Sequence, residues 1–266
     1  MAAMTLPLQQ SPAFARALTA FGSEVSCDAP VILNRHFGPL GRVGFTSRGP
    51  LCKTPLRDLR HAGRRVFNAE HDCAVHYKAA GFRQIITPVH IADWDLTGFA
   101  QDRRHQMHQK WRNQLRRAKT SNLRVREIAW DGSGHPLFHH SVKLAQIRKF
   151  RALPTGLIAA FAQLNPSDAI IFEGYDKGHL IAALLILCHG PTATLQTAWT
   201  SPQGRATHTH NLLMSRAADR LAASGHTTFD LGLVETDNAA SLARFKLRTG
   251  ARLRKLGGTW IAIPGL

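Results

Sequence analysis

The chain has 266 residues, of which 34 are Lys or Arg and 17 are Asp or Glu, giving a formal net charge of +17. This length predicts one large or two small domains, and a hydrophobic content of 44% suffices for a sizeable core. The charge indicates a polyanionic partner, such as nucleic acid, phosphate groups or an acidic membrane surface. The simpler alternative is a basic surface with no dedicated partner.

The cysteines, the N-terminal segment and the longest apolar run argue against three classes of protein. Cys27, Cys52, Cys73 and Cys188 lack the spacing of a disulfide framework or a zinc site, so we expect reduced thiols in a cytoplasmic protein. The N-terminal segment has no basic stretch before an apolar run, which argues against a signal peptide. The run LIAALLILC at 180–188 is too short to cross a bilayer and predicts a buried strand.

The first half predicts alternating strands and helices. We expect helices at 11–22, 54–63 and 71–81, and strands at 29–35, 42–51, 64–70 and 82–91, with a turn at 38–41. The order of these elements resembles that of the second half, so the two halves predict a tandem α/β arrangement whose N-terminal copy is reduced.

The second half predicts a mixed sheet. We expect strands at 123–130, 168–176, 179–188, 192–201 and 227–234, a closing strand or hairpin at 251–263, and helices at 135–153, 155–164, 208–225 and 238–250. Three consecutive hairpin strands followed by a βαβ crossover make the sheet antiparallel first and parallel after. The parallel pair, 192–201 and 227–234, should splay and leave a cleft.

A basic helix is predicted at 102–120, between the two halves. It carries an apolar stripe at Met107, Trp111, Leu115 and Ala118, and an adjacent cationic row at Arg112, Arg116 and Lys119. Like charges at this spacing repel one another, and the central stretch 107–119 contains no acid to offset them. The row is therefore either a solvated face or a surface that phosphates neutralise. We expect domains at 1–101 and 121–266, joined by this connector.

Three stretches resemble the FemABX peptidyltransferases. MHQKWRNQLRRAKTSNLRV (107–125) resembles the Lys-x-Arg-Asn-x-Leu-Arg-x-Ala segment that joins the two domains of that family. GFTSRGPL (44–51) is similar to its strand ending in Arg-Gly-Pro, and FDLGLVETDNAASLARFKLRTGA (229–251) to its C-terminal stretch. The related BioF2-like acetyltransferase domain shares the C-terminal pattern. The resemblance implies tandem domains of the acetyltransferase (GNAT) superfamily.

The resemblance also implies a reaction and its residues. Members of the family move an amino acid from aminoacyl-tRNA to an amine of a peptidoglycan precursor, which would bring this chain into peripheral contact with a membrane-bound acceptor. Lys246 matches the family's Phe-Lys lysine and would stabilise the developing oxyanion. Arg48 and Arg112 would face phosphate groups, and Arg116 and Arg117 would support them. The implied co-substrate is aminoacyl-tRNA, with no tightly bound cofactor and no metal.

Carboxylates near the end of the predicted strand 227–234 suggest the remaining chemistry. Asp230 lies near the carboxyl end of that strand, and Glu235 follows in the loop. Aminolysis needs a deprotonated amine, so either carboxylate is a candidate base or amine-orienting group. The alternative for Asp230 is a turn or cap carboxylate. For Lys246, helix periodicity alone favours a solvated lysine.

Two other functions remain open on the sequence. An acetyl-CoA donor needs backbone amides at a helix N-terminus, and Gly204, Arg205 and Ala206 in the segment 201–211 occupy the matching position. A non-catalytic RNA-binding protein on the same fold would account for the charge alone. The fifteen histidines include no cluster with a complete ligand set, so we expect no metal site.

Overall fold

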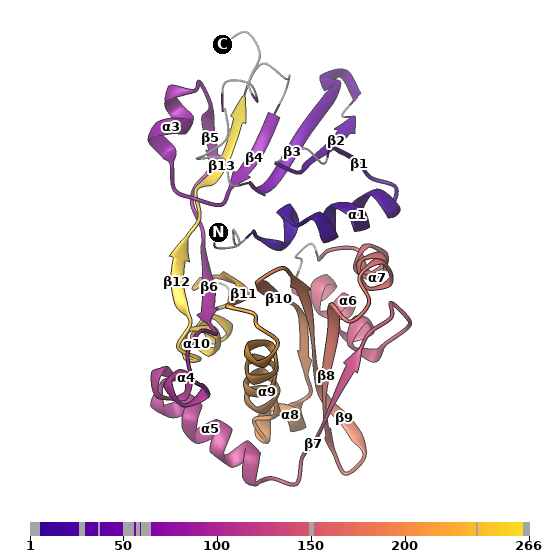
Figure 1. The fold of residues 1–266 in the computed structure, drawn as a ribbon, viewed down its shortest axis with the longest axis vertical. Coiled ribbons are helices and arrows are strands. Elements are labelled where there is room, and N and C mark those ends of the chain that lie inside the picture. Colours follow the sequence, from indigo (N-terminus) through magenta and orange to yellow (C-terminus); the bar gives the residue numbers. More distant parts are fainter. Residues whose placement is uncertain are drawn as a thin grey trace.

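The computed structural model describes residues 6–26, 30–36, 38–49, 56, 59, 65–148, 152–237 and 239–262. Two mixed sheets dominate it (Figure 1). The mixed α/β class expected from the sequence is confirmed. The predicted helix at 54–63 lies almost entirely outside the described residues, as does Pro50–Leu51 of the Arg-Gly-Pro strand.

The first sheet has six strands in the order β1-β2-β3-β4-β13-β5. The elements of this part are the 3-10 turns η1 (Leu8–Gln10) and η2 (Gly38–Leu40), the helices α1 (Pro12–Ala20) and α3 (Ala74–Ala79), and the strands β1 (Glu24–Ser26), β2 (Ile32–His36), β3 (Arg42–Gly49), β4 (Arg65–Ala69), β5 (Arg83–Ile86) and β13 (Gly258–Ala262). Among the described strands of this sheet, only β3 and β4 run parallel to each other, and the other neighbours are antiparallel.

The second sheet has seven strands in the order β12-β6-β11-β10-β9-β8-β7. Its strands are β6 (His90–Asp95), β7 (Arg124–Ala129), β8 (Ala169–Asp176), β9 (His179–His189), β10 (Thr192–Thr200), β11 (Thr228–Val234) and β12 (Arg252–Lys255). The helices around it are α4 (Ala100–Gln106), α5 (Gln109–Thr120), α6 (Pro136–Arg148), α7 (Thr155–Leu164), α8 (Pro202–Ala206), α9 (Thr209–Ala223) and α10 (Ala240–Leu247). The predicted change from antiparallel to parallel pairing is confirmed, at β10 and β11.

The two sheets exchange a strand. In each, an antiparallel series leads to one parallel pair, followed by two antiparallel strands. β13, from the C-terminal end of the chain, follows β4 in the first sheet, and β6, from the N-terminal half, follows β11 in the second. β6 and β13 therefore each join a sheet built mainly from the other predicted domain. The domain boundaries at 1–101 and 121–266 stay a prediction.

The exchange occurs at two crossing segments, and it corrects two predicted strands. The predicted strand 82–91 and the predicted closing element 251–263 each divide between the sheets, as β5 and β6 and as β12 and β13. Gly257 lies at the second crossing, where a Cβ atom would fall 2.0 Å from the carbonyl oxygen of His71. Only glycine fits so close to a neighbouring backbone, which explains the Gly-Gly pair.

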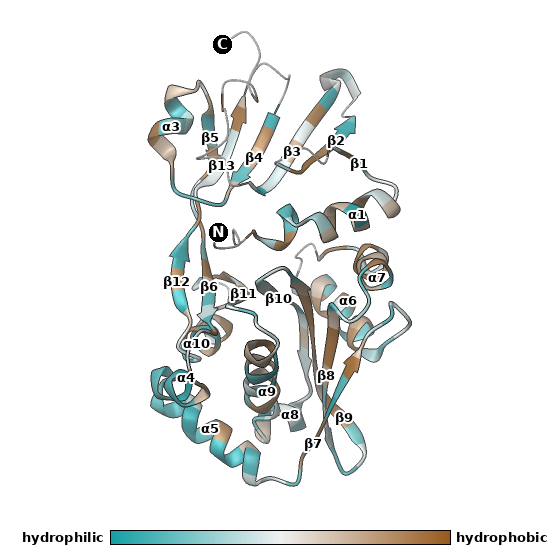
Figure 2. Ribbon diagram, in the orientation of Figure 1, coloured by the Kyte–Doolittle hydropathy of each residue, from teal (hydrophilic) through white to brown (hydrophobic). Residues whose placement is uncertain are grey.

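Two helical layers cover the second sheet. Phe229 and Leu212 belong to a core under α5, α9 and α10, and Phe161 and Leu185 to a core under α1 and α7 on the opposite face. Figure 2 shows hydrophobic residues along β8 and β9 and hydrophilic ones along α4 and α5. The buried run at 180–188 is thus the expected strand, within β9. No helix among the described residues is long and apolar enough to span a membrane.

The basic connector is two helices, where the sequence predicts one. The chain is extended at Met107 and His108, and the His108 side chain accepts a hydrogen bond from the backbone N–H of Lys110 to start α5. The predicted apolar stripe is buried nevertheless. Trp111 lies edge-on to Trp94 of β6, with ring centroids 6.2 Å apart, and near Phe245 of α10 at 6.1 Å. These contacts fix α5 against the second sheet.

Of the two described cysteines, one confirms the expectation of reduced thiols and one contradicts it, whereas Cys27 and Cys52 lie outside the described residues. Cys188 is a free, buried thiol, whose pKa burial raises to about 12. Cys73, in contrast, is disulfide-bonded. The wide spacing of the cysteines therefore concealed a disulfide, because segments far apart in the sequence can meet in the fold.

Candidate active site

The parallel strands β10 and β11 separate after a short paired stretch. They pair only over Thr192–Thr194 and Thr228–Asp230. Immediately beyond, each strand has a bulge against its other neighbour, β10 after Leu195 and β11 after Asp230. A bulge bends a strand and increases its local twist, so the two bulges turn the strands apart. Beyond Thr194 and Asp230 the two strands no longer pair, and this stretch of lost pairing, the opening between β10 and β11, is the splay that the sequence predicted.

Lys246 lies beside this opening. It is 8% exposed, and its Nζ donates a hydrogen bond of 2.8 Å to the carbonyl oxygen of Leu233 in the separated part of β11. Gly232 also adjoins the amine, since a Cβ atom there would lie 3.8 Å from Nζ. Burial lowers the pKa of Lys246 to about 8, against an opposing attraction from Asp230. Burial disfavours the charged form, so this ammonium holds its proton weakly.

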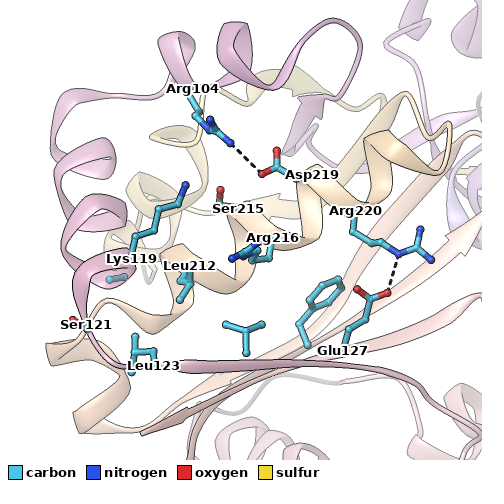
Figure 3. Close-up of a pocket in the computed structure, with 13 residues that line it drawn as sticks. Arg104, Lys119, Ser121, Leu123, Glu127, Leu212, Ser215, Arg216, Asp219 and Arg220 are labelled. Carbon is cyan, nitrogen blue, oxygen red and sulfur yellow. Dashed lines mark hydrogen bonds and ion pairs between the residues drawn. The ribbon is translucent and has the colours of Figure 1, made fainter.

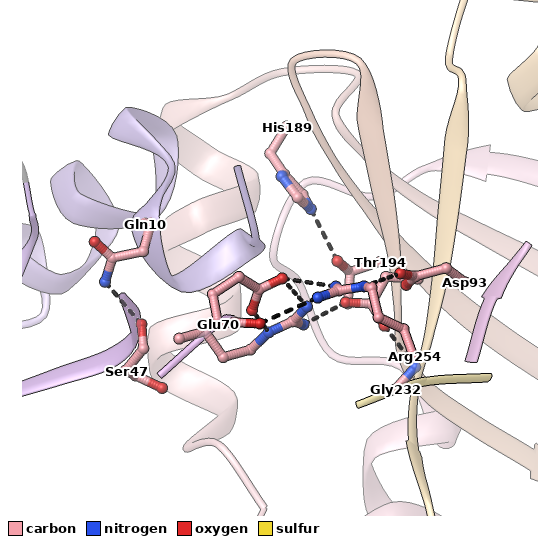
Figure 4. Close-up of polar contacts among 10 residues, drawn as sticks. Gln10, Ser47, Glu70, Asp93, His189, Thr194, Gly232 and Arg254 are labelled. Carbon is pink, nitrogen blue, oxygen red and sulfur yellow. Dashed lines mark hydrogen bonds and ion pairs between the residues drawn. The ribbon is translucent and has the colours of Figure 1, made fainter. Parts of the chain in front are cut away.

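A buried ion network lies next to the opening, at the junction of the two sheets (Figure 4). Arg48 donates from Nε and Nη2 to both oxygens of Glu70, at 2.7 and 3.0 Å, and from Nη1 to Asp230. Arg254 donates to Glu70 and to Asp93, each at 2.6 Å. The three carboxylates and two guanidiniums carry a formal net charge of −1, and Asp230 attracts the ammonium of Lys246 without forming an ion pair with it.

Asp230 is a structural member of this network. It is 2% exposed, and its other carboxylate oxygen accepts a hydrogen bond of 2.7 Å from the backbone N–H of Gly232 at the bulge. Asp230 thus holds the bulge in place and ties Arg48 to β11. Glu235 lies exposed in the loop beyond β11. The structure brings Asp230, Arg48 and Lys246 together and leaves Glu235 at the surface.

The guanidinium of Arg48 is fully engaged. Each of its three nitrogen atoms donates to a carboxylate, and Arg48 has a φ of +49°, a backbone conformation that side chains rarely adopt. Burial lowers the pKa of Arg48, but Asp230 and Glu70 more than offset that effect and raise it above its ordinary value. This geometry favours a role in joining the sheets over the phosphate contact that the resemblance implies.

The connector arginines lie on the outer face of α5. Arg112 donates to the carbonyl oxygen of His105 and to the side chain of Gln109, and Arg116 and Arg117 are exposed. Arg117 lies close enough to the start of α9 to act on His208. The pKa of His208 is lowered by burial and, to a lesser extent, by the positive charge of Arg117. Of the three arginines, Arg117 is thus the one near the segment proposed for a donor's phosphates.

Gly204, Arg205 and Ala206 lie in the one-turn helix α8, and the backbone amides of Gly204 and Arg205 already donate hydrogen bonds. Ser201 accepts from the backbone N–H of Gly204 through its hydroxyl and from that of Arg205 through its carbonyl, both at 3.0 Å. A Cβ atom at Gly204 would lie 2.4 Å from the carbonyl oxygen of Ile181. Gly204 therefore serves close packing, and these amides are not directed at a ligand.

Sequence reasoning missed Glu70, Asp93 and Arg254. Their partners lie far along the chain, since Arg254 is 184 positions from Glu70 and 161 positions from Asp93. One signal was present: Asp93 lies within the strand β6, between the buried Ala92 and Trp94. A charge in such a strand predicts a buried partner. Among the described residues, no group of three or more His, Cys, Asp or Glu side chains could hold a metal ion.

Comparison with solved structures identifies proteins of the same fold. FemX superposes with a TM-score of 0.74 at 12% identity, covering 98% of this chain and 96% of that one. The C-terminal domain of a putative lysylphosphatidylglycerol synthetase from Agrobacterium fabrum gives 0.59 at 14% identity, covering 97% and 89%. L-PGS from Bacillus licheniformis gives 0.57 at 12%, covering 97% and 93%. At such identities, the likeness concerns the fold.

Comparison with protein families identifies the catalytic class. None of the curated proteins compared with the chain matches it. The model of the acetyltransferase (GNAT) domain matches residues 101–246, more than half of the chain, from the connector to Lys246. The resemblance inferred from the sequence is thereby confirmed at the level of the superfamily. The chain belongs to the acetyltransferase (GNAT) domain family, and it is an acyltransferase.

Proposed function

We propose that this acyltransferase moves an aminoacyl group from aminoacyl-tRNA to an amine acceptor, such as the peptide of a peptidoglycan precursor. The observation that carries the proposal is the buried ammonium of Lys246 beside the separated strands β10 and β11. The FemX-like fold supports it, as does the net charge of +17, which suits an RNA donor. The reaction belongs in the cytoplasm, where aminoacyl-tRNA is made.

The proposed chemistry is aminolysis of an ester. The acceptor nitrogen forms a bond to the ester carbonyl carbon, and the carbonyl oxygen becomes an oxyanion. Lys246 stabilises that oxyanion as a cation in a site shielded from water. When the carbonyl re-forms, the carbon–oxygen bond to the ribose breaks, the amine loses a proton and the ribose hydroxyl gains one. The unpaired edges of β10 and β11 offer backbone hydrogen bonds to the extended donor.

Acetyl-CoA is the competing donor, since the family is one of acetyltransferase domains. The backbone amides of Gly204 and Arg205 favour aminoacyl-tRNA over it, because Ser201 already accepts from both. A pyrophosphate at this helix start would have to displace those hydrogen bonds. A non-catalytic RNA-binding role does not explain why Lys246 is buried, because a cation that binds RNA has to be accessible to it.

The test is to follow a labelled acyl group from each donor. The purified chain is incubated with peptidoglycan precursors and either tRNA charged with a mixture of labelled amino acids or labelled acetyl-CoA. We expect label to move to the precursors from aminoacyl-tRNA and not from acetyl-CoA, and deacylated tRNA to inhibit the transfer. Transfer from acetyl-CoA alone would contradict the proposed donor, but the assignment of the chain as an acyltransferase would still hold.

A further inference from the structure

A cavity lies apart from the opening between β10 and β11. It has a volume of about 820 Å³ and is bounded by α4, α5, α9 and the strands β7 and β8 (Figure 3). Its walls are the C-terminal end of α5 and the middle of α9, whereas Lys246 comes from α10. None of the residues assigned to acyl transfer lines it.

The wall of this cavity carries an excess of positive charge. Four cations and two acids line it, namely Arg104, Lys119, Arg216 and Arg220 with Glu127 and Asp219. Arg220 pairs with Glu127 at 2.9 Å, and Arg104 pairs with Asp219 at 3.5 Å. Asp219 is shared, because the buried Arg103 also donates to it at 3.1 Å. Both carboxylates therefore already form ion pairs with arginines.

Lys119 and Arg216 have no ion pair among the described residues, yet both line the cavity. Burial, and then repulsion from Arg104, lower the pKa of Lys119, although Asp219 opposes this, and Arg216 adds to the repulsion. The cations are thus close enough to repel one another. Both side chains are exposed, so solvent screens this repulsion, and an anion between them would relieve what remains of it.

The floor of the cavity is apolar. It is formed by Leu123 and Val125 at the start of β7, by Phe172 of β8 and by Leu212 of α9. Figure 3 shows Lys119 and Arg216 on the side opposite Leu123. A ligand that satisfied both parts would carry an anionic group toward the cations and an apolar group on the floor. The volume lies within the range of small-molecule sites.

We propose that this cavity binds a phosphate ester, with the phosphate between Lys119 and Arg216 and the apolar or aromatic part of the ester on the floor around Leu123. Arginine suits a bidentate contact with phosphate oxygens, and lysine adds a point charge. A nucleotide and a short anionic lipid share this chemistry. The inference does not depend on the proposed aminoacyl transfer, because the two sites share no residue.

Calorimetry at physiological salt tests the site with three probes: adenosine 5′-monophosphate, dihexanoylphosphatidylglycerol below its micelle concentration, and inorganic phosphate. The test variant is Lys119→Gln with Arg216→Gln. The matched control is Lys78→Gln with Lys143→Gln, which removes the same charge at exposed positions outside the cavity. A third variant, Leu123→Ala, reduces the floor alone.

We expect at least one ester to bind the unaltered chain, and which one binds identifies the source of the ligand. Its affinity should fall tenfold or more in the cavity variant and less than twofold in the control. Leu123→Ala should weaken the ester and leave inorganic phosphate unchanged. The proposal is overturned if neither ester binds at millimolar concentration, if both double variants lose affinity equally, or if inorganic phosphate binds as tightly as the esters.

Discussion

Arg48 is a largely buried cation and Lys246 a buried one, and their surroundings affect their pKa values in opposite ways. Arg48 donates to two carboxylates, so its charge is compensated and its pKa is raised. Lys246 donates to one backbone carbonyl, has no ion pair among the described residues, and has its pKa lowered to about 8. A cation paired with carboxylates contributes to structure, whereas a buried cation without an ion pair can respond to a charge that develops during a reaction.

Removing the Arg48 side chain should destabilise the fold. Arg48→Ala leaves Glu70 and Asp230 buried with less compensation, which costs about 3–5 kcal/mol of the free energy of unfolding. Arg35→Ala, at an exposed position in β2, should change it by less than about 0.5 kcal/mol. Urea denaturation measures both. Equal stabilities for the two variants would show that the network contributes nothing to the fold.

The low pKa of Lys246 predicts opposite pH trends for activity and stability. The unfolded chain binds the Lys246 proton up to the ordinary lysine pKa near 10.5, and the folded chain loses it from about 8. Between these values the unfolded state holds more protons, so the contribution of Lys246 to stability rises with pH. The transfer rate should fall over the same window as the cation is lost.

A pH–rate profile and denaturation curves check these trends. Lys246→Arg keeps its charge throughout this range, so its profile should lack the decline near pH 8 whatever its absolute rate. A wild-type rate that stays constant from pH 8 to 10 would show that the charge of Lys246 is not used.

Among the elements, those formed by neighbouring segments were predictable from the sequence. The hairpin strands β8, β9 and β10 and the helix α9 follow from periodicity and turns, because their partners are close along the chain. The sequence could not place β6 and β13, since each completes a sheet of the other half. The strand patterns of 82–91 and 251–263 run without interruption in the sequence. The point at which each segment passes from one sheet to the other depends on tertiary pairing, which the sequence pattern does not show.

The crossing at Gly257 should tolerate no side chain. Gly257→Ala would place a Cβ atom 2.0 Å from the carbonyl oxygen of His71, which is backbone and cannot turn aside. We expect a loss of about 1–3 kcal/mol in the free energy of unfolding. Gly134→Ala is the matched control, because nothing lies within 4 Å of that position. Thermal melts that coincide for both variants would contradict the tight crossing.

At the scale of the whole molecule, the site depends on both sheets. Arg48 and Glu70 come from the first sheet region, and Asp93, Asp230 and Arg254 from the second. The sequence singled out Lys246 and Arg48 through stretches that resemble family motifs, and Asp230 through its place near the carboxyl end of a predicted strand. It could not reveal that Arg48 and Asp230 pair, because they lie 182 positions apart in the sequence. Helix periodicity alone would have left Lys246 in solvent.

The positive charge on α5 should contribute to binding of the tRNA donor. Arg116 and Arg117 on α5 are exposed and have no ion pair among the described residues. Replacing both by Gln should weaken tRNA binding and reduce the slope of log affinity against log salt by about one to two. The exposed pair Lys78 and Lys143, replaced likewise, serves as the control for net charge. An unchanged slope for the α5 variant would show that this face is solvated and does not contact tRNA.

The most direct test of the central claim is the single-turnover rate of aminoacyl transfer by Lys246→Met, measured beside its melting temperature. Methionine fills the same space without the charge, so the fold should melt at the same or a higher temperature. If the ammonium beside β10 and β11 stabilises the oxyanion, the rate should fall by about a hundredfold or more. A variant that transfers at the wild-type rate would contradict the account.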